Sequence, residues 1–507
     1  MKKIIIICFL FLILFVNFTI LFASNKINKI VIVRKDMGRF GLPVESRNQQ
    51  ELIYNCFSRI VSLDSTNSII ADLADRWTID KDHKIYIFHI RDNIYFHDNT
   101  KLTVKDIKKS LEYEIKHFIN YFSTEIREIE GVDEYLKGDI NHIKGIVAEK
   151  NKIKFILKEP IPNFLSYLSD LNLSVFKIKN GKPIGTGGYK PVKLITKGRK
   201  TTDIILVKYK KYFFNIEKTP DIVEIKIKDH YKNINNYDII KFNDINDIKK
   251  SYLKYYNLYK IQSNTIQFLS FNLRSYWGKN KNFRKFIIYS FDFQKFLKKH
   301  DIYQFAQPNL IPVGYSFYRD VHPFPRNNEK LGNYYLSKIK DKQKPVILLS
   351  TNVFYRKELM QSIRNLLIRK GFKVIIYNQP YNIFIKSLLA VVYNKRKDID
   401  MLPLGKTLTA PPFSVYHYLY SVFYPGAENN AENYSNKKII KLLNKLKLVL
   451  YKKERLQIIN AMIDIYNNDA PSRPLFTSID YYLVNKKIKR FLIHTLLYID
   501  YRDIRLY

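Results

Sequence analysis

The chain has 507 residues, 46% of them hydrophobic and 15% aromatic, and its 86 basic and 46 acidic residues leave a net charge of +40 at pH 7. This length excludes a single small core, so two or three lobes are expected. Two cysteines exclude a disulfide framework, and no repeat or low-complexity tract is present.

The positive charge has two interpretations. An excess of this size is typical of proteins that bind nucleic acid or anionic membranes. The lysines, however, are spread among Ile, Asn and Tyr along the whole chain. We therefore favour a drift in composition and expect no nucleic-acid partner.

The N-terminus predicts export. Lys2 and Lys3 precede an apolar run from Ile4 to Phe22, and Ala23 has the small side chain that a signal peptidase needs. We expect residues 1–23 to be a signal peptide that is cut after Ala23. The alternative is an uncleaved anchor, because about 20 apolar residues can span a bilayer.

Cysteine usage favours a free periplasmic protein. Cys8 lies inside the apolar run and not at its C-terminal end, which argues against a lipid anchor. After cleavage only Cys56 remains, so the exported chain forms no intramolecular disulfide although the compartment would permit one. The fold must therefore rest on its cores.

The first part of the exported chain predicts short strands and helices. Lys29 to Arg34 has the apolar run of a buried strand, and Gln50 to Ile60 has helical spacing of its apolar residues. Alternation predicts a half-buried strand from Lys84 to Ile90, with a turn and a second strand after it. Thr103, with an acid three residues later, begins a helix that runs to about Phe118.

The later part predicts alternating strands and helices. Strands are expected at Ile153–Leu157, Ile204–Tyr209 and Ile222–Ile227, and Pro160 and Pro162 open a helix that runs through Leu168. A βαβ unit, the usual building block of an α/β lobe, is predicted from a strand, a helix and a second strand at Val346–Ser350, Arg356–Lys370 and Phe372–Tyr377. Asn436 to Asn468 is helical, with a break near Lys452.

Several blocks of sequence then point to a family. The most specific series reads IIADLADRW at 69–77, IYIFHIRD at 85–92 and FHDNTKLTVKDI at 96–107. Further blocks follow in order: GTGGY at 185–189, FLSFN at 268–272, FRKFIIYSFD at 283–292, PNLIP at 308–312 and DAPSRPL at 469–475. The chain resembles the extracellular solute-binding proteins of family 5, which serve peptide, oligopeptide and nickel ABC transporters; Asn99 replaces the glycine usual in that family.

The resemblance implies an α/β fold of the periplasmic binding protein type II-like class, with two large lobes that close on a cleft and a smaller extra lobe. Closure is a hinge motion around bound solute. We expect lobe I to be discontinuous, with residues 24–50, 170–265 and 480–507. The extra lobe II is expected at residues 51–169 and lobe III at residues 266–479.

Searches for catalytic sets favour a binding protein over an enzyme. The sequence has neither a Gly-x-Ser-x-Gly elbow nor a His-Glu-x-x-His helix. Cys56 lies on the apolar side of a predicted helix, which favours a core thiol. His83, His89 and His97 are close in sequence but fall on a strand and two separate turns, so no metal site or cofactor is expected.

The cargo depends on an anchor that the family implies. In its peptide-binding members an Asp in lobe III binds the α-ammonium group of the peptide through a charge-assisted bond. Aligned on residues 400–405, this chain has Lys406 where Trp is common and Thr409 where that Asp falls, with Leu408 between them. A lysine there would repel an ammonium group. The predicted ligand contacts in lobe III are therefore Lys406, Leu408 and Thr409.

Three explanations of the missing Asp stay open. Another acid takes its role, with Asp398, Asp400 and Glu428 as candidates; or backbone pairing holds the peptide; or the cargo lacks a free N-terminus. The loop of Gly41 and Leu42 is predicted to contact the ligand by pairing its backbone with an extended peptide.

The leading hypothesis is a periplasmic, monomeric receptor that delivers a peptide or peptide-sized solute to an ABC transporter permease. The rival is a scaffold or sensor that keeps this fold and uses its basic surface to contact a membrane or a glycan.

Overall fold

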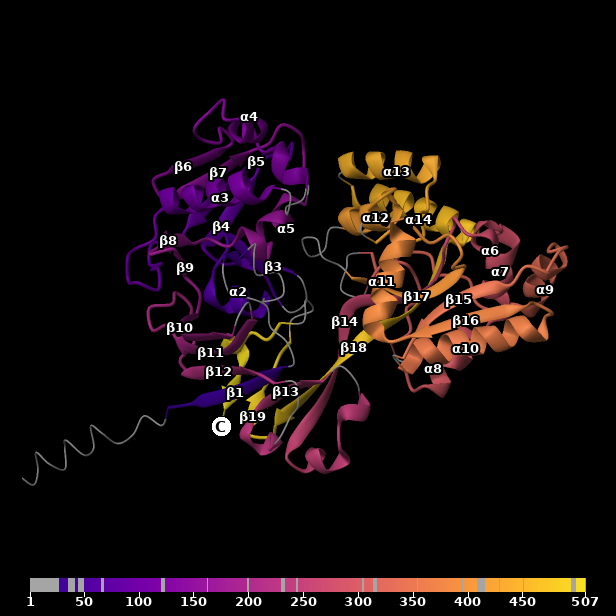
Figure 1. The fold of residues 1–507 in the computed structure, drawn as a ribbon. Coiled ribbons are helices and arrows are strands. Elements are labelled where there is room, and N and C mark those ends of the chain that lie inside the picture. Colours follow the sequence, from indigo (N-terminus) through magenta and orange to yellow (C-terminus); the bar gives the residue numbers. More distant parts are fainter. Residues whose placement is uncertain are drawn as a thin grey trace, which may run out of the picture.

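The computed structural model describes residues 27–34, 42–43, 50–64, 68–119, 124–161, 163–197, 200–228, 233–242, 245–302, 305–312, 317–352, 354–393, 395–407, 415–427, 429–449, 451–493 and 498–506. The chain forms two halves, joined by the long strands β14 (Tyr256–Phe271) and β18 (Ser472–Asn485) (Figure 1). Among the described residues, none of the helices combines the length and the apolar character needed to span a bilayer.

A ten-stranded sheet runs through both halves. Its order is β10-β11-β12-β1-β13-β18-β14-β17-β15-β16. The other eight strands are β10 (Tyr189–Lys197), β11 (Lys200–Lys208), β12 (Ile222–Ile227), β1 (Lys29–Arg34), β13 (Ile239–Phe242), β17 (Met401–Thr407), β15 (Val346–Thr351) and β16 (Val374–Gln379). Strands β14 and β18 pair over most of their length, with register shifts between Gln262 and Ile266 and between Gln267 and Phe268.

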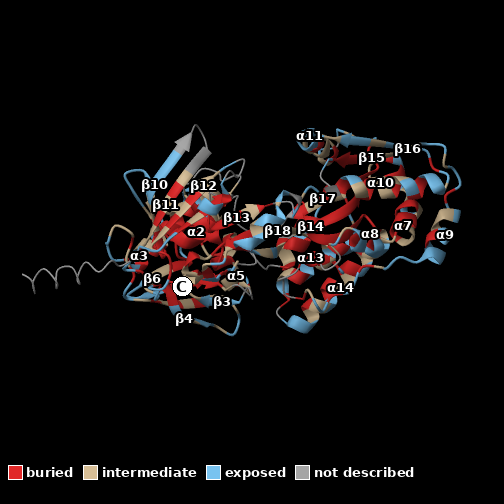
Figure 2. Cartoon of the chain, turned by 90° about the horizontal axis from the view of Figure 1, so that it is seen from below, coloured by how far each residue is buried: buried red, intermediate tan, exposed pale blue. Residues whose placement is uncertain are grey.

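One half consists of lobes I and II and the other of lobe III, and lobe I holds β1 and β10 to β13. Its core combines the buried faces of β1, β11 and β12 with helix α2 (Gln50–Cys56) and with C-terminal residues such as Tyr501. The thiol of Cys56 is buried in this core, and burial raises its pKa. The β10–β11 ribbon projects from the lobe with exposed residues (Figure 2). A short pair, β19 (Ile488–Arg490) and β20 (Arg505–Leu506), lies near the C-terminus.

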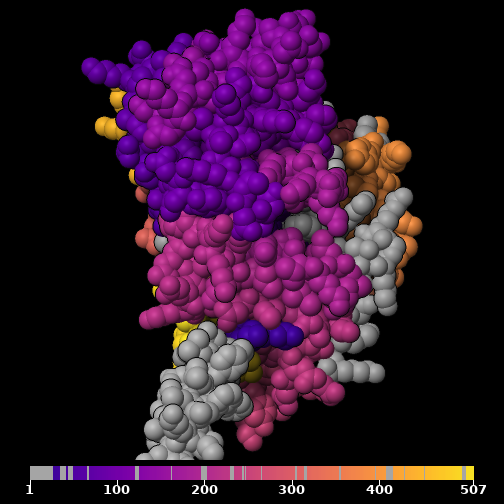
Figure 3. Space-filling view, turned by 90° about the vertical axis from the view of Figure 1, so that its left-hand side faces the viewer, coloured from indigo at the N-terminus to yellow at the C-terminus, as the bar shows by residue number. Residues whose placement is uncertain are grey.

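Lobe II has its own sheet, in the order β4-β5-β7-β6. The bounds are β4 (Ala74–Ile79), β5 (Ile85–Ile90), β7 (Lys152–Ile156) and β6 (Ile146–Glu149), and the helices are α3 (Val104–Phe118), α4 (Val132–Lys137) and α5 (Phe164–Leu168). Alternation in β5 buries Tyr86, Phe88 and Ile90 against α3, whose N-terminus has the predicted capping box of Thr103 and Asp106. Figure 3 shows this indigo and purple lobe stacked on lobe I.

Two short strand pairs adjoin lobes I and II. They are β2 (Val61–Leu63) with β3 (Ile69–Ala71), and β8 (Lys177–Lys179) with β9 (Lys182–Ile184). The second strand predicted after Asn93 does not form; Tyr95 makes only an isolated bridge with Lys101. That segment turns back at Asn99, which has a positive φ.

Lobe III packs helices on both faces of β14 to β17. The predicted βαβ unit is confirmed as β15, α10 (Phe354–Arg369) and β16, and the predicted break near Lys452 separates α13 (Lys437–Leu448) from α14 (Lys452–Asp469). The remaining helices are α6 (Tyr276–Lys279), α7 (Lys281–Ser290), α8 (Phe293–Lys299), α9 (Glu329–Ser337), α11 (Tyr381–Val392) and α12 (Val415–Phe423).

Three main hydrophobic cores underlie these lobes, and the one in lobe III is the most extensive. The first half of β14 packs with lobe I, and its second half, from Ile266 on, packs in lobe III. We propose lobe boundaries close to the expected ones, with one change: α2 belongs to lobe I, because Leu52 and Ile53 pack in the lobe I core.

Candidate functional site

Strand directions place two sets of strand ends opposite each other. β1 is parallel to β12 and β13, and β13 and β14 are both antiparallel to β18, so these four strands run from lobe I toward lobe III. β17 is antiparallel to β14 and parallel to β15, which is parallel to β16, so these three run toward lobe I. The carboxyl ends of β1, β12 and β13 therefore point toward those of β15, β16 and β17 across the junction of the lobes, and open α/β sheets bind ligands at such ends.

The predicted contacts are only partly described. Gly41, Leu408 and Thr409 lie outside the described residues, as does the candidate acid Glu428. Leu42 is half-buried and packs against the lobe I core. Lys406 lies near the end of β17, beside the junction.

Lys406 does not present a free charge. Its Nζ lies 2.8 Å from Oε1 of Glu432, and both side chains are 1% exposed. The ammonium group also lies 4.7 Å from the centre of the Phe268 ring, and Ser270 donates a hydrogen bond to the same carboxylate. Burial lowers the pKa of Lys406, and Glu432 opposes that shift. The repulsion expected between Lys406 and an ammonium group is thus largely cancelled by Glu432.

The two described acids that could replace the missing Asp have partners in the protein. Asp400 is buried and accepts hydrogen bonds from the backbone N–H groups of Trp277, at 3.0 Å, and Ile347, at 2.8 Å. Asp398 forms an ion pair with Arg396. Asp400 thereby links the start of β17 to α6 and β15.

A polar cluster at the lobe III side of the junction was missed by the sequence analysis. Gln267 of β14 accepts hydrogen bonds from the hydroxyl of Tyr355 and, at 3.3 Å, from Nη2 of Arg356, and it donates to Ser478 of β18. Arg356 also donates from Nε to the Tyr355 hydroxyl at 2.8 Å. We call these four residues the junction cluster.

The environment of the junction cluster fixes its protonation. Burial raises the pKa of Tyr355 to about 12, against the opposing effect of Arg356, so the phenol stays protonated and donates to Gln267. The Arg356 guanidinium packs on the rings of Tyr381 and Phe384, at 5.9 and 5.5 Å from their centres. The cluster therefore brings a cation, a phenol and an amide to the carboxyl edge of the lobe III sheet.

Lobes II and III also touch. Lys447 of α13 lies 3.3 Å from Glu128, and His417 of α12 lies 3.6 Å from Glu125 and packs edge-on against Tyr167. A cavity of about 50 Å³ is enclosed between these surfaces. These contacts join the outer ends of the two halves.

Within the described part of the chain, no group of three or more His, Cys, Asp or Glu residues has a geometry suited to a metal ion. Two of the three neighbouring histidines are accounted for individually. His97 donates from Nε2 to the carbonyl oxygen of Gly187 at 2.9 Å, and His89 lies 3.2 Å from Arg76.

Comparison with known families decides the identity of the fold. The family model of bacterial extracellular solute-binding proteins, family 5 Middle, matches residues 68–429. The chain belongs to this family. The family predicted from the motif blocks is thus confirmed for this solute-binding protein. The expected fold class is confirmed by solved structures that share its α/β architecture.

Relatives extend over nearly the whole chain. The dipeptide-binding protein DppE of Bacillus subtilis (strain 168) is 21% identical over 472 residues, 84% of this chain and 82% of that one. HbpA2 from Haemophilus parasuis superposes with a TM-score of 0.72 at 17% identity and covers 95% of this chain and 100% of its own. DppA from Helicobacter pylori, in complex with the peptide STSA, gives 0.67 at 21% identity, covering 94% and 98%.

Proposed function

We propose that this solute-binding protein is the receptor of an ABC transporter and binds a peptide at the junction of lobes I and III. The observation that carries the proposal is the opposition of strand carboxyl ends at this junction in a member of this family. The names of two relatives support it: one is a dipeptide-binding protein and the other is in complex with a peptide.

We propose that the peptide is held in an extended form. An extended peptide pairs its backbone with chain that continues from the ends of β1 and β17, as in β-strand addition. Gly41, Leu42, Leu408 and Thr409, which follow those strands, are the proposed contacts. The junction cluster offers the Arg356 guanidinium to a carboxylate, and Tyr355 and Gln267 hold that guanidinium in position.

We assign the Lys406–Glu432 pair a structural role near the end of β17. Because the two charges neutralise each other, Lys406 does not disfavour a peptide with a free N-terminus.

We further propose that the protein acts in the periplasm, after removal of residues 1–23, as a monomer that hands its solute to a permease and catalyses no reaction. The signal pattern at the N-terminus and the family support the first point, and the lack of a recognised catalytic motif in the sequence supports the last.

The first experiment is to purify the exported form, denature it and identify the released small molecules by mass spectrometry. We expect a mixture of peptides of two to five residues. Repeated release of a sugar, haem or metal chelate without peptide would contradict the peptide assignment, and the absence of any solute that raises the melting temperature would favour a scaffold.

A second experiment places the site with two variants that each remove one hydroxyl group. Tyr355→Phe should weaken the binding of a released peptide, remade synthetically, by roughly 2- to 12-fold in calorimetry, since a hydrogen bond contributes about 0.5–1.5 kcal/mol. Tyr393→Phe, at a side chain 68% exposed on the far end of α11, is the control and should leave affinity unchanged. Equal affinity of all three proteins would move the site away from the junction cluster.

A further inference from the structure

A second cavity lies where lobes I and II meet. Its volume is about 430 Å³, and its walls come from α2, β2 and β3, the turn after β11 and the C-terminal segment. None of the junction cluster residues lines it. The cavity is thus separate from the proposed peptide site and is of a size that small ligands occupy.

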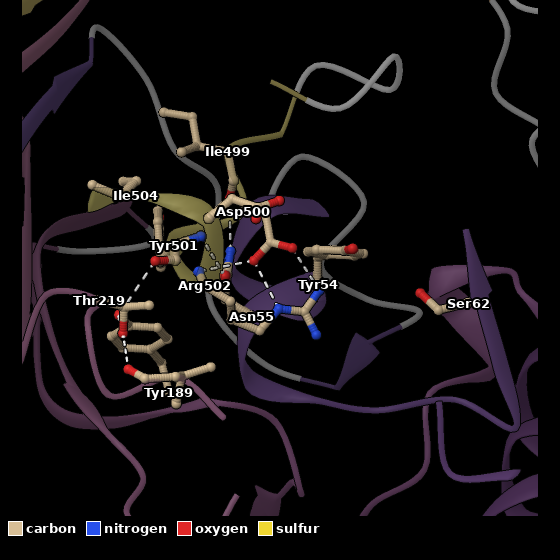
Figure 4. Close-up of polar contacts among 12 residues, drawn as sticks. Tyr54, Asn55, Ser62, Tyr189, Thr219, Ile499, Asp500, Tyr501, Arg502 and Ile504 are labelled. Carbon is tan, nitrogen blue, oxygen red and sulfur yellow. Dashed lines mark hydrogen bonds and ion pairs between the residues drawn. The ribbon is translucent and has the colours of Figure 1, made fainter. Parts of the chain in front are cut away.

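One wall of this cavity is rigidly built. Arg502 donates two hydrogen bonds to Asp500, from Nε and Nη2 to the two carboxylate oxygens at 2.7 and 2.8 Å. Its Nη1 donates to the hydroxyl of Tyr212 at 2.7 Å, and the guanidinium lies 4.5 Å from the centre of the Tyr54 ring. Figure 4 shows Arg502 with Asp500 and Tyr54 beside its guanidinium group. Arg502 is therefore fully engaged and shapes the cavity without needing a ligand.

The floor of the cavity, in contrast, has unused polar atoms. Asp72 lines the cavity and is 2% exposed; its Oδ2 accepts from the backbone N–H of Arg59 at 3.0 Å and lies 3.5 Å from Nη2 of Arg59. Its Oδ1 has no hydrogen-bond partner among the described residues, and neither have Nε and Nη1 of Arg59. Leaving a buried carboxylate oxygen without a hydrogen-bond donor costs about 1–3 kcal/mol or more of stability. Oδ1 of Asp72 can therefore accept a hydrogen bond from a ligand.

The rim carries cations that are held in place but not used up. Arg505 donates from Nη1 to the carbonyl oxygens of Arg502 and Ile504, at 2.6 and 3.0 Å, which leaves its other edge open. Arg490 lies 3.2 Å from Asp503 and its side chain is 54% exposed. These two guanidinium groups provide donors for a carboxylate at the mouth of the cavity.

The charges of the cavity balance. Its lining has three arginines and four aspartates, and Arg59 beneath Asp72 supplies the fourth positive charge. A ligand with a net charge would leave one group uncompensated in a partly buried site. The remaining wall is apolar, formed by Phe214, Ile216 and Leu492.

We propose that this cavity is a second binding site, for a free α-amino acid with an apolar side chain. The α-ammonium group donates to Oδ1 of Asp72, the α-carboxylate accepts from Arg490 and Arg505, and the side chain packs against Phe214 and Leu492. A zwitterion matches the balanced charges, with its two ends placed between the acidic floor and the basic rim.

The test is calorimetric titration of the full exported protein with L-leucine and with two analogues. N-acetyl-L-leucine lacks the ammonium group and L-leucinamide lacks the carboxylate. We expect L-leucine to bind and each analogue to bind at least about tenfold more weakly. Asp72→Asn should cause a similar loss. No binding of L-leucine up to millimolar concentration, with an ordered water on Oδ1 of Asp72 in a crystal structure, would overturn the proposal.

Two controls keep the result specific. Leu492→Trp places a bulky side chain at a residue 37% exposed on the rim, so it should block L-leucine without disturbing the buried Arg59–Asp72 pair even if Asp72→Asn fails to fold. Tyr355→Phe, at the junction cluster, should leave L-leucine binding unchanged, and a saturating peptide should not compete. Competition by the peptide, together with binding that survives Leu492→Trp, would assign L-leucine to the interlobe site and contradict the second site.

Discussion

Lys406 illustrates how one residue gains its meaning from a partner that the sequence does not reveal. Glu432 lies 26 positions later, and nothing in the residues around either side chain predicts the pairing. We expect Glu432→Gln to lower the free energy of unfolding by about 3–5 kcal/mol, because it leaves a buried ammonium group without its counter-charge. Urea denaturation at pH 7 measures the loss.

The matching control is the double variant Lys406→Met with Glu432→Gln. Since it removes both charges, it should regain most of the stability lost by the single variant. A single variant as stable as the parent protein would mean that Lys406 is neutral or solvated in the native state.

His97 predicts a pH dependence of stability. Burial lowers its pKa from 6.5 to about 4, and the hydrogen bond to Gly187 opposes that shift. Between these values the unfolded chain binds a proton that the folded protein does not bind, so stability is lost as the pH falls from 6.5 toward 4, by at most about 1.4 kcal/mol per pH unit. His97→Gln should flatten this part of the curve of unfolding free energy against pH; identical curves would contradict the assignment.

At the scale of elements, local sequence patterns predicted the structure correctly where it depends on residues within the same segment. The capping box at Thr103 and the βαβ unit of β15, α10 and β16 depend on residues close in sequence, and both are confirmed. The helix predicted at Gln50–Ile60 ends at Cys56 instead. After it, Ser58 forms a β-bridge with Val175, and strand β2 pairs with β3. Such tertiary pairing overrides local helical spacing.

The junction cluster escaped prediction for the same reason. Gln267 and Tyr355 are 88 positions apart and meet only because β14 and the start of α10 share one edge of the sheet. No motif marks them in the sequence. The predicted site residues came instead from a resemblance that aligned the ends of strands, and most of them lie outside the described residues.

The GTGGY segment at 185–189 is explained by a close approach of two elements. A Cβ atom on Gly187 would lie 2.4 Å from the backbone carbon of Cys56 and 2.5 Å from the carbonyl oxygen of Asn55, at the end of α2. We expect Gly187→Ala to destabilise the protein by roughly 1–3 kcal/mol, because backbone must shift to accept the methyl group.

Gly188→Ala is the matched control for that substitution in thermal unfolding. Its Cβ would meet only side-chain atoms, of Arg502 at 3.2 and 3.3 Å, so a shift of a few tenths of an ångström suffices and no backbone has to move. Its melting temperature should fall by less than that of Gly187→Ala. The opposite order would mean that the segment is not held against α2.

At the scale of the molecule, lobes I and III share one sheet, whereas lobes II and III meet through side chains such as Lys447 and Glu128. This ion pair is about a third exposed at Lys447, so it contributes at most about 1 kcal/mol. Lys447→Glu places like charges opposite each other. Small-angle X-ray scattering should then show a larger radius of gyration, with little change in melting temperature.

The charge-swapped double variant, Lys447→Glu with Glu128→Lys, restores the attraction and should return the radius of gyration to that of the parent protein. Scattering curves that stay the same in all three proteins would show that this contact does not hold the outer ends of the two halves together.

Because the thiol of Cys56 is buried, the closing motion of the lobes can be observed directly with dyes attached to introduced cysteines. Its enclosure in the lobe I core and its raised pKa both suppress the thiolate that reacts with maleimide dyes. A pair of cysteines introduced at exposed positions, one replacing Val192 in lobe I and one replacing Tyr393 in lobe III, could then be labelled without first removing the native one. Energy transfer between the two dyes in single molecules would report how often the protein closes without cargo.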